Sequence, residues 1–212
     1  MSFPISGLYA ITQTEHKSYD IIVMEVEAVL RGGAVVVQYR DKQPQETDQL
    51  AIQILKLCQQ YKVPLLINDN VELAVRIGAD GVHIGRDDGS IKWARKQLGE
   101  HAIIGVSCYD SIEHAQEAQT QGATYVAFGR FFPSTSKPLA LPATIETLRL
   151  AKQLLRIPIV AIGGILPENG SLLLEAGADL LAVIGGLFDE RPEQAAMTYQ
   201  ALFERFTLTF DQ

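Results

Sequence analysis

The sequence predicts an α/β fold, specifically a single (β/α)₈ TIM-barrel domain that spans residues 1–212. Three observations lead to this prediction: the chain length, a repeated Gly-Ala signal, and eight short apolar runs separated by segments with helical spacing. A chain of 212 residues can build one full-sized core but not two ordinary domains. Apolar runs that alternate with helical crossovers are typical of a parallel sheet buried on both faces. Eight such units in this length fit a closed barrel.

A Gly-Ala pair precedes a short apolar run at four places in the chain. Glycine is favoured just after the last turn of a helix, so each pair is expected to end a helix and begin a strand. Four further apolar runs lie between or before these. In chain order, the predicted strands are 8–11, 34–39, 64–67, 80–84, 102–106, 124–128, 158–162 and 179–184.

Helical spacing of apolar residues predicts the connecting helices. They include the segments 46–61, 71–77, 91–98, 111–121, 143–155 and 192–206. The alternative architecture is an open, doubly wound sheet. No glycine-rich dinucleotide-binding fingerprint follows the first predicted strand, which argues against the commonest form of that fold.

The composition excludes several classes of partner. The net charge of −7 disfavours generic binding to nucleic acids or anionic membranes, because both require a cationic surface. Two cysteines, Cys58 and Cys108, cannot form a disulfide framework and are interpreted as small buried apolar residues. The N-terminal segment lacks a signal-peptide pattern, and no apolar stretch is long enough to span a bilayer. We therefore expect a cytoplasmic protein with small-molecule substrates; a homo-oligomer is compatible with these data.

A barrel places its functional residues just after the carboxyl ends of its strands. The second predicted strand ends in Gln38, Arg40 and Lys42, whose alternation puts the three side chains on one face. Two cations and an amide on one face suit a phosphate or pyrophosphate group, and arginine can bind it in a forked geometry. The competing interpretation is a solvated strand end.

Acidic residues follow the third and fourth predicted strands. Asp69 and Asp88 could meet at one hard cation, because adjacent barrel strands end side by side. Mg²⁺ is commonly held by one or two carboxylates together with water and substrate phosphate oxygens. A helix is predicted after each motif, however, so helix capping is an equally good explanation of these carboxylates.

The fifth predicted strand ends near Ser107, whose hydroxyl is interpreted as a hydrogen-bonding group. No histidine is connected to Ser107 by sequence spacing, so a nucleophilic role is not indicated. His83 lies within the fourth predicted strand, where a hydrogen-bonded core histidine is favoured over a catalytic base.

Two further segments suggest binding of anions. The sixth predicted strand leads to Ser134, Ser136 and Lys137, which form either an anion-binding loop or an ordinary Ser/Thr turn. Gly-Gly pairs, at 163–164 and 185–186, end the last two strands. In barrels these two loops often bind phosphate through backbone N–H groups, and glycine allows the phosphate to approach closely.

Taken together, these segments closely resemble the thiamine-phosphate synthase family over nearly the whole chain, from Gly7 to about Phe188. Each motif follows a different predicted strand, and all occur in the family's order. The motifs are Gln38-x-Arg40-x-Lys42, Ile67-Asn-Asp69, Asp80-Gly-Val-His-Ile-Gly85, Gly105-Val-Ser107, Phe132-Pro-Ser-x-Ser-Lys137 and Ile162-Gly-Gly-Ile165.

The resemblance implies a role for each matching residue. Gln38 would contact an aminopyrimidine and Ser107 would lie near it. The diphosphate of hydroxymethylpyrimidine diphosphate would be bound by Arg40, Lys42, Asn68, Ser134, Ser136 and Lys137. The catalytic set would be Arg40, Lys42, Ser107 and Lys137, and Asp69 and Asp88 would bind Mg²⁺ as the cofactor. The backbone at Gly164, Ile184 and Gly185 would hold the phosphate of a thiazole substrate.

In this family, pyrophosphate leaves first and the thiazole nitrogen then attacks the resulting pyrimidine-methyl cation. Two alternatives remain open at this point. One is a thiazole tautomerase on the same barrel, which would not need the complete diphosphate and metal set. The other is a non-catalytic barrel that binds a phosphorylated ligand.

Overall fold

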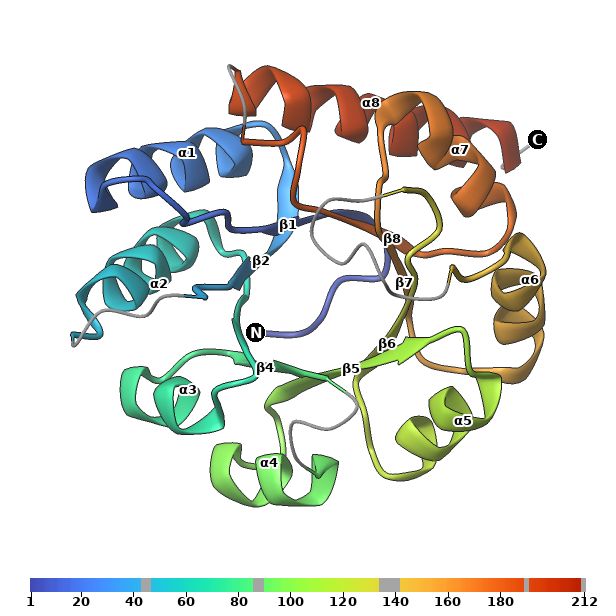
Figure 1. The fold of residues 1–212 in the computed structure, drawn as a ribbon, viewed down its shortest axis with the longest axis horizontal. Helices are drawn as coiled ribbons and strands as arrows, with labels where there is room; N and C mark the ends of the chain where they lie inside the picture. Colours follow the sequence, from blue (N-terminus) through green and yellow to red (C-terminus); the bar gives the residue numbers. More distant parts are fainter. Residues whose placement is uncertain (43–46, 86–89, 134–141, 189–190, 211–212) are drawn as a thin grey trace.

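A computed structural model shows a closed barrel of eight parallel strands in the order β1-β2-β3-β4-β5-β6-β7-β8 (Figure 1). The structure describes residues 1–42, 47–85, 90–133, 142–188 and 191–210. The strands are β1 (Gly7–Ile11), β2 (Ala34–Tyr39), β3 (Leu65–Asn68), β4 (Gly81–Ile84), β5 (Ile103–Tyr109), β6 (Tyr125–Phe128), β7 (Ile159–Ile162) and β8 (Leu180–Val183). The predicted (β/α)₈ barrel and all eight predicted strands are confirmed.

A helix follows each strand, and the helices form a ring around the barrel (Figure 1). They are α1 (Tyr19–Arg31), α2 (Gln49–Tyr61), α3 (Val71–Ile77), α4 (Ile91–Leu98), α5 (Ile112–Thr120), α6 (Ile145–Leu154), α7 (Pro167–Glu175) and α8 (Pro192–Phe210). None of the helices in the described part of the chain has the length and hydropathy of a transmembrane segment.

Two predicted helix starts were too early by a few residues, and for α6 the reason is a capping residue. Helix α6 begins after Thr144, whose hydroxyl accepts a hydrogen bond from the Thr147 N–H, so the predicted start at 143 was too early. Helix α2 begins after Asp48 rather than at 46, a position outside the described residues. Capping depends on local backbone geometry, which apolar spacing does not report.

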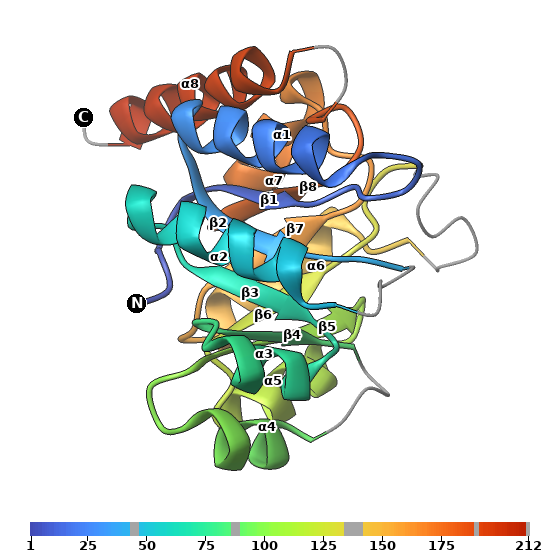
Figure 2. The same ribbon diagram turned by 90° about the vertical axis from the view of Figure 1, so that its left-hand side faces the viewer.

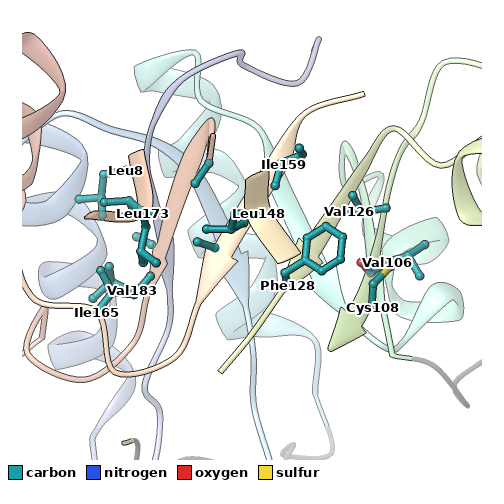
Figure 3. Packing of buried hydrophobic residues seen from close by; sticks show 14 of the residues in the cluster. Leu8, Val106, Cys108, Val126, Phe128, Leu148, Ile159, Ile165, Leu173 and Val183 are labelled. Carbon is teal, nitrogen blue, oxygen red and sulfur yellow. Dashed lines mark hydrogen bonds between the residues drawn. The ribbon is translucent and has the colours of Figure 1, made fainter. Parts of the chain in front are cut away.

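Two separate apolar layers form because consecutive strand residues point to opposite faces of the sheet. Leu8 packs outward with residues of the surrounding helices, such as Leu148 and Leu173, between the sheet and the helices (Figure 3). The next residue, Tyr9, faces the barrel interior with side chains of the other strands. The interior of the barrel, away from the carboxyl ends of the strands, is therefore a packed core rather than an open pore.

The N-terminal segment covers the end of the barrel at which the strands begin. The Phe3 ring stacks on Tyr125, with centroids 4.1 Å apart and planes inclined by 5°. The terminal ammonium of Met1 lies 3.0 Å from the Asp80 carboxylate, which holds this segment in place. Figure 2 shows the N-terminus at one end of the barrel, and Figure 1 shows it near the barrel axis. The cavity described below lies at the opposite ends of the strands.

A glycine creates the space that Tyr125 occupies. Gly105 of β5 pairs with His83 of β4 on one side and with Tyr125 of β6 on the other. A Cβ atom at Gly105 would overlap the Cζ and Oη atoms of Tyr125. Because the collision is with a fully buried ring, a larger residue could not be accommodated without moving Tyr125.

Gly105→Ala is therefore expected to lower the free energy of unfolding by about 1–3 kcal/mol, the usual cost of overpacking a core. Urea denaturation measures this change. Gly185→Ala is the matched control, since a Cβ there meets no atom within 4 Å, and its stability should change by less than about 0.5 kcal/mol. Equal stability of the two variants would contradict the assigned role of Gly105.

Candidate active site

A cavity of about 530 Å³ opens at the carboxyl ends of the strands. All nine predicted site residues in the described part of the chain line it: Gln38, Arg40, Lys42, Asn68, Asp69, Ser107, Gly164, Ile184 and Gly185. The other predicted site residues, Asp88, Ser134, Ser136 and Lys137, lie outside the described residues. The structure therefore brings together residues from five different strand ends, as a barrel requires.

The backbone that carries the two cations is held by a buried threonine. The Thr12 hydroxyl accepts a hydrogen bond from the Arg40 N–H at 2.9 Å and donates one to the Arg40 carbonyl oxygen at 3.1 Å. Thr12 is only 1% exposed and lies just after β1. The β2 end is thus fixed to its neighbour beyond the regular strand pairing, which orients Arg40 and Lys42 along the cavity rim.

Asp41, between the two cations, is held by two hydroxyl groups. Thr14 donates to its Oδ1 at 3.0 Å and Tyr39 donates to its Oδ2 at 3.1 Å. Burial, followed by the charge of Asp41, raises the pKa of Tyr39, so its hydroxyl remains a hydrogen-bond donor. On the rim itself, Lys42 lies 3.9 Å from the Glu15 carboxylate in a largely exposed pair.

Asp69 has an ordered carboxylate at the end of β3. Its Oδ2 accepts a hydrogen bond from the Asn68 side chain at 2.6 Å, and its Oδ1 accepts one from the Gly85 N–H at 3.2 Å. Its φ of +59° is an uncommon conformation for a residue other than glycine, and such conformations concentrate at functional sites. Asp69 is therefore held toward the end of β4.

Helix capping does not account for Asp69. Helix α3 is capped by Asn70, whose Oδ1 accepts from the Leu73 N–H at 2.8 Å, and helix α4 is capped by Ser90. Among the described residues no three His, Cys, Asp or Glu side chains form a metal-binding group. One carboxylate with a neighbouring amide is nevertheless a sufficient protein contribution to a Mg²⁺ site, because Mg²⁺ retains several water ligands.

The cavity floor contains a network of hydrogen bonds between side chains of five strands. Gln38 Nε2 donates to the Tyr9 hydroxyl at 2.7 Å, and this hydroxyl lies 2.7 Å from that of Tyr125. The Tyr125 hydroxyl lies 2.8 Å from His83 Nδ1, and His83 Nε2 lies 2.9 Å from Ser107 Oγ. We call Gln38, Tyr9, Tyr125, His83 and Ser107 the interior network. Its two end residues both line the cavity.

This network corrects two interpretations of the sequence. Ser107 does have a histidine partner, His83, which sequence spacing could not reveal because the two residues come from different strands. His83 is hydrogen-bonded as predicted, but it also lines the cavity. Alternation along the strands carried the missed signal, since Tyr9, His83 and Tyr125 all occupy inward-facing positions.

In the described part of the chain, the side chain within hydrogen-bond distance of His83 Nδ1 is Tyr125, not the carboxylate of a hydrolytic triad. A catalytic imidazole needs a carboxylate at its other nitrogen to stabilise the imidazolium form. Here that partner is the Tyr125 hydroxyl, and burial raises the pKa of Tyr125 well above its ordinary value, so it remains neutral. The geometry therefore favours Ser107 as a hydrogen-bonding group.

The two Gly-Gly pairs have different explanations. A Cβ at Gly163 would overlap Arg130, and one at Gly164 would overlap the Pro133 carbonyl oxygen. Packing against the segment after β6 is therefore sufficient to require glycine at 163–164. Gly185 has open space around it, so its exposed backbone is accessible from the cavity. Arg130 also lines the cavity and is a cation that the predicted site did not include.

Comparison with known proteins supports the same family throughout the barrel. A family model described as thiamine monophosphate synthase matches residues 8–187. A thiamine-phosphate synthase of Marinobacter nauticus is 50% identical over 202 residues, which cover 94% of this chain and 90% of that protein. The chain belongs to the thiamine monophosphate synthase family.

Further relatives agree with this assignment. A thiamine-phosphate synthase of Nitrosococcus oceani is 48% identical over 211 residues and covers 98% of this chain and 97% of its own. The solved structure of a thiamine phosphate pyrophosphorylase from Pyrococcus furiosus superposes with a TM-score of 0.85 at 33% identity, covering 94% of this chain and 96% of that one. Both the sequence and the fold therefore match family members over almost their full length.

Thr12→Val is expected to weaken the site through the backbone of Arg40. The valine cannot make either hydrogen bond, so it leaves Arg40 N–H and C=O groups without their partner and lowers stability by about 1–3 kcal/mol. Urea denaturation should show this loss, and calorimetry should show weaker binding of pyrophosphate. Thr198→Val, which removes an exposed hydroxyl from α8, is the control and should change neither quantity.

Proposed function

We propose that this chain catalyses the thiamine-phosphate synthase reaction as a transferase. It would join 4-amino-2-methyl-5-hydroxymethylpyrimidine diphosphate to 4-methyl-5-(2-phosphoethyl)thiazole and release pyrophosphate and thiamine phosphate. The observation that carries this proposal is the single cavity in which Arg40, Lys42, Asp69 and Ser107 meet, in a chain that matches the family from residue 8 to 187.

In the proposed reaction, the bond between the pyrimidine methylene carbon and the diphosphate oxygen breaks first. Both electrons leave with the diphosphate, and the electron-rich aminopyrimidine ring stabilises the methylene cation. The thiazole nitrogen then donates its lone pair to that carbon and forms the new C–N bond. The protein would stabilise the departing negative charge and hold the two substrates in line.

The two cations that follow β2 would bind the diphosphate. Arg40 and Lys42 line the cavity, and the two hydrogen bonds of the Thr12 hydroxyl hold the backbone of Arg40. Lys137, Ser134 and Ser136 would add a cation and two hydroxyl groups to the same diphosphate. Such groups accelerate the reaction when they bind the leaving diphosphate more tightly than the substrate.

The two organic substrates would occupy different walls of the cavity. Gln38 and Ser107 would contact the aminopyrimidine, while Asn68 would help to hold the diphosphate. The backbone of Gly164, Ile184 and Gly185 would bind the thiazole phosphate through N–H groups. The open space around Gly185 supports this assignment.

Asp69, with Asp88, would hold Mg²⁺ next to the diphosphate. Carboxylate oxygen is a preferred ligand of this ion, and Asp69 is held in place by Asn68 and Gly85 rather than used as a helix cap. When bound, the ion would neutralise part of the charge that develops on the leaving diphosphate.

Neither alternative activity is favoured by these observations. A thiazole tautomerase or a non-catalytic phosphate-binding barrel would have no use for Arg40, Lys42 and Asp69 at one cavity. The similar relatives described above carry the name thiamine-phosphate synthase or thiamine phosphate pyrophosphorylase. Small-molecule substrates fit the cavity, and the buried free thiols of Cys58 and Cys108 support a cytoplasmic location.

The direct test is pyrophosphate release from the purified protein with both substrates present. We expect release to require the pyrimidine diphosphate, the thiazole phosphate and Mg²⁺, and thiamine phosphate to form in equal amount. Isomerisation of a thiazole substrate without pyrophosphate release would favour the tautomerase. Tight binding of the thiazole phosphate without turnover would instead favour the non-catalytic barrel.

Asp69→Asn is expected to raise the Mg²⁺ concentration needed for half-maximal activity by roughly 10-fold or more, because a neutral amide is a poorer ligand. Asp88→Asn should act in the same direction. A magnesium titration of activity measures both effects. Asp48→Asn is the control, because Asp48 pairs with Arg76 outside the cavity. An unchanged titration in either Asp69→Asn or Asp88→Asn would remove that carboxylate from the proposed metal site.

A further inference from the structure

The interior network connects Gln38 to Ser107 through Tyr9, Tyr125 and His83, and of these five residues all but Tyr125 line the cavity. Gln38 and Ser107 line the cavity, whereas Tyr125 lies fully buried between Tyr9 and His83. Each of the three side chains in the middle of the network, Tyr9, Tyr125 and His83, has two neighbours within it. The direction in which one member donates therefore determines the direction in which the next must donate.

The direction is set at the Gln38 end. Gln38 Nε2 donates to the Tyr9 oxygen, so the Tyr9 proton needs an acceptor elsewhere. Within the described part of the chain, the remaining partner of that hydroxyl is Tyr125. Tyr9 therefore donates to Tyr125, and Tyr125 donates to His83 Nδ1. Burial raises the pKa of both tyrosines, so each hydroxyl keeps its proton.

The opposite direction would leave a buried donor without a partner. If Tyr125 donated to Tyr9, the Tyr9 oxygen would accept two hydrogen bonds and its own proton would have no acceptor among the described protein groups. Tyr9 is only 1% exposed, so the full desolvation penalty of an unpaired donor would apply. The direction from Gln38 toward His83 satisfies both tyrosine hydroxyls.

We propose that the interior network is a positioning device that sets the tautomer of His83 and thereby the hydrogen-bonding role of Ser107. With Nδ1 accepting from Tyr125, neutral His83 carries its proton on Nε2 and donates it to Ser107 Oγ. The Ser107 proton is then directed to an acceptor in the cavity. Tyr9, Tyr125 and His83 are positioning residues, since they act through Ser107 and Gln38.

This assignment specifies the chemical class of the ring that the cavity floor selects. Ser107 offers a donor, while Gln38, with Nε2 engaged by Tyr9, offers its Oε1 as an acceptor. The two groups together fit a flat heteroaromatic ring that carries an acceptor nitrogen and an amino donor, as an aminopyrimidine does. The inference rests on the proposed function and deepens it, because it explains how the first substrate is recognised.

The first test reads the tautomer directly. Protein labelled with ¹⁵N-histidine gives long-range ¹H–¹⁵N correlations that show which ring nitrogen of His83 is protonated, and His83→Asn identifies its signals among the four histidines. We expect a neutral ring with the proton on Nε2 near pH 7.5. A ring protonated on Nδ1, or on both nitrogens, would overturn the proposal.

Gln38→Glu tests the direction of the network. The introduced carboxylate, once ionised, accepts the Tyr9 proton, so Tyr125 should donate to Tyr9 and the His83 proton should move to Nδ1. A change in the tautomer of His83 caused by a substitution on β2 could not come from packing alone. An Nε2-protonated ring retained after the carboxylate has ionised would contradict the proposed coupling.

Tyr125→Phe tests the consequence for catalysis. It removes the donor to His83 Nδ1 while keeping the ring in its Gly105 space, so folding should be preserved. We expect kcat/KM for the pyrimidine diphosphate to fall about tenfold, with the KM for the thiazole phosphate unchanged. Tyr61→Phe, which loses a hydroxyl bonded to Glu27 outside the barrel, is the control and should match the wild type.

Measuring both the tautomer of His83 and the enzymatic activity distinguishes a failure of the proposed function from a failure of the proposed network. Wild-type protein with no pyrophosphate release, but with the expected tautomer and its reversal in Gln38→Glu, would refute the proposed function and leave the network intact. Active wild-type protein in which Tyr125→Phe changes neither the tautomer nor kcat/KM would refute the network and leave the function intact.

Discussion

The buried hydroxyl of Tyr125 connects the packing of the barrel to its chemistry. Its ring occupies the space left by Gly105 and is covered by Phe3, while its oxygen lies within hydrogen-bond distance of Tyr9 and His83. A polar atom that is completely buried is costly unless both of its hydrogen-bonding capacities are used. To meet this requirement, β1, β4, β5 and β6 must keep one relative arrangement. The floor of the cavity depends on that arrangement.

Binding of a diphosphate by an acidic protein requires a local excess of positive charge. The overall charge is −7, yet Arg40, Lys42 and Arg130 all line the same cavity. The backbone of Arg40 is held by the Thr12 hydroxyl. A backbone that is already ordered loses less entropy on binding, so this contact contributes to recognition. The carboxylate of Asp69 adds a negative charge beside these cations. A bound Mg²⁺ would outweigh that negative charge, so the site would still attract a diphosphate.

Much of the site could be predicted because the barrel fold places chemistry at the strand ends. Alternation alone placed Gln38, Arg40 and Lys42 on one face, and all three line the cavity. For Asp69 the sequence left capping and metal binding equally open. The structure removes capping, since Asn70 and Ser90 cap the two helices concerned. For Gly163 and Gly164 the sequence likewise left phosphate binding and packing both open. Only the structure shows their packing partners, which come from the segment after β6.

By itself, the sequence determined the barrel, its eight strands and the strand ends that line the cavity, because periodicity and turn residues are local signals. Only the tertiary structure decided which side chains meet inside the barrel. His83 and Ser107 belong to adjacent strands, and Tyr9 and Tyr125 approach each other across the interior. These contacts depend on closure and on strand register, which bring inward-facing residues to one level. No spacing along the chain records that level, so the interior network emerged only from the folded barrel.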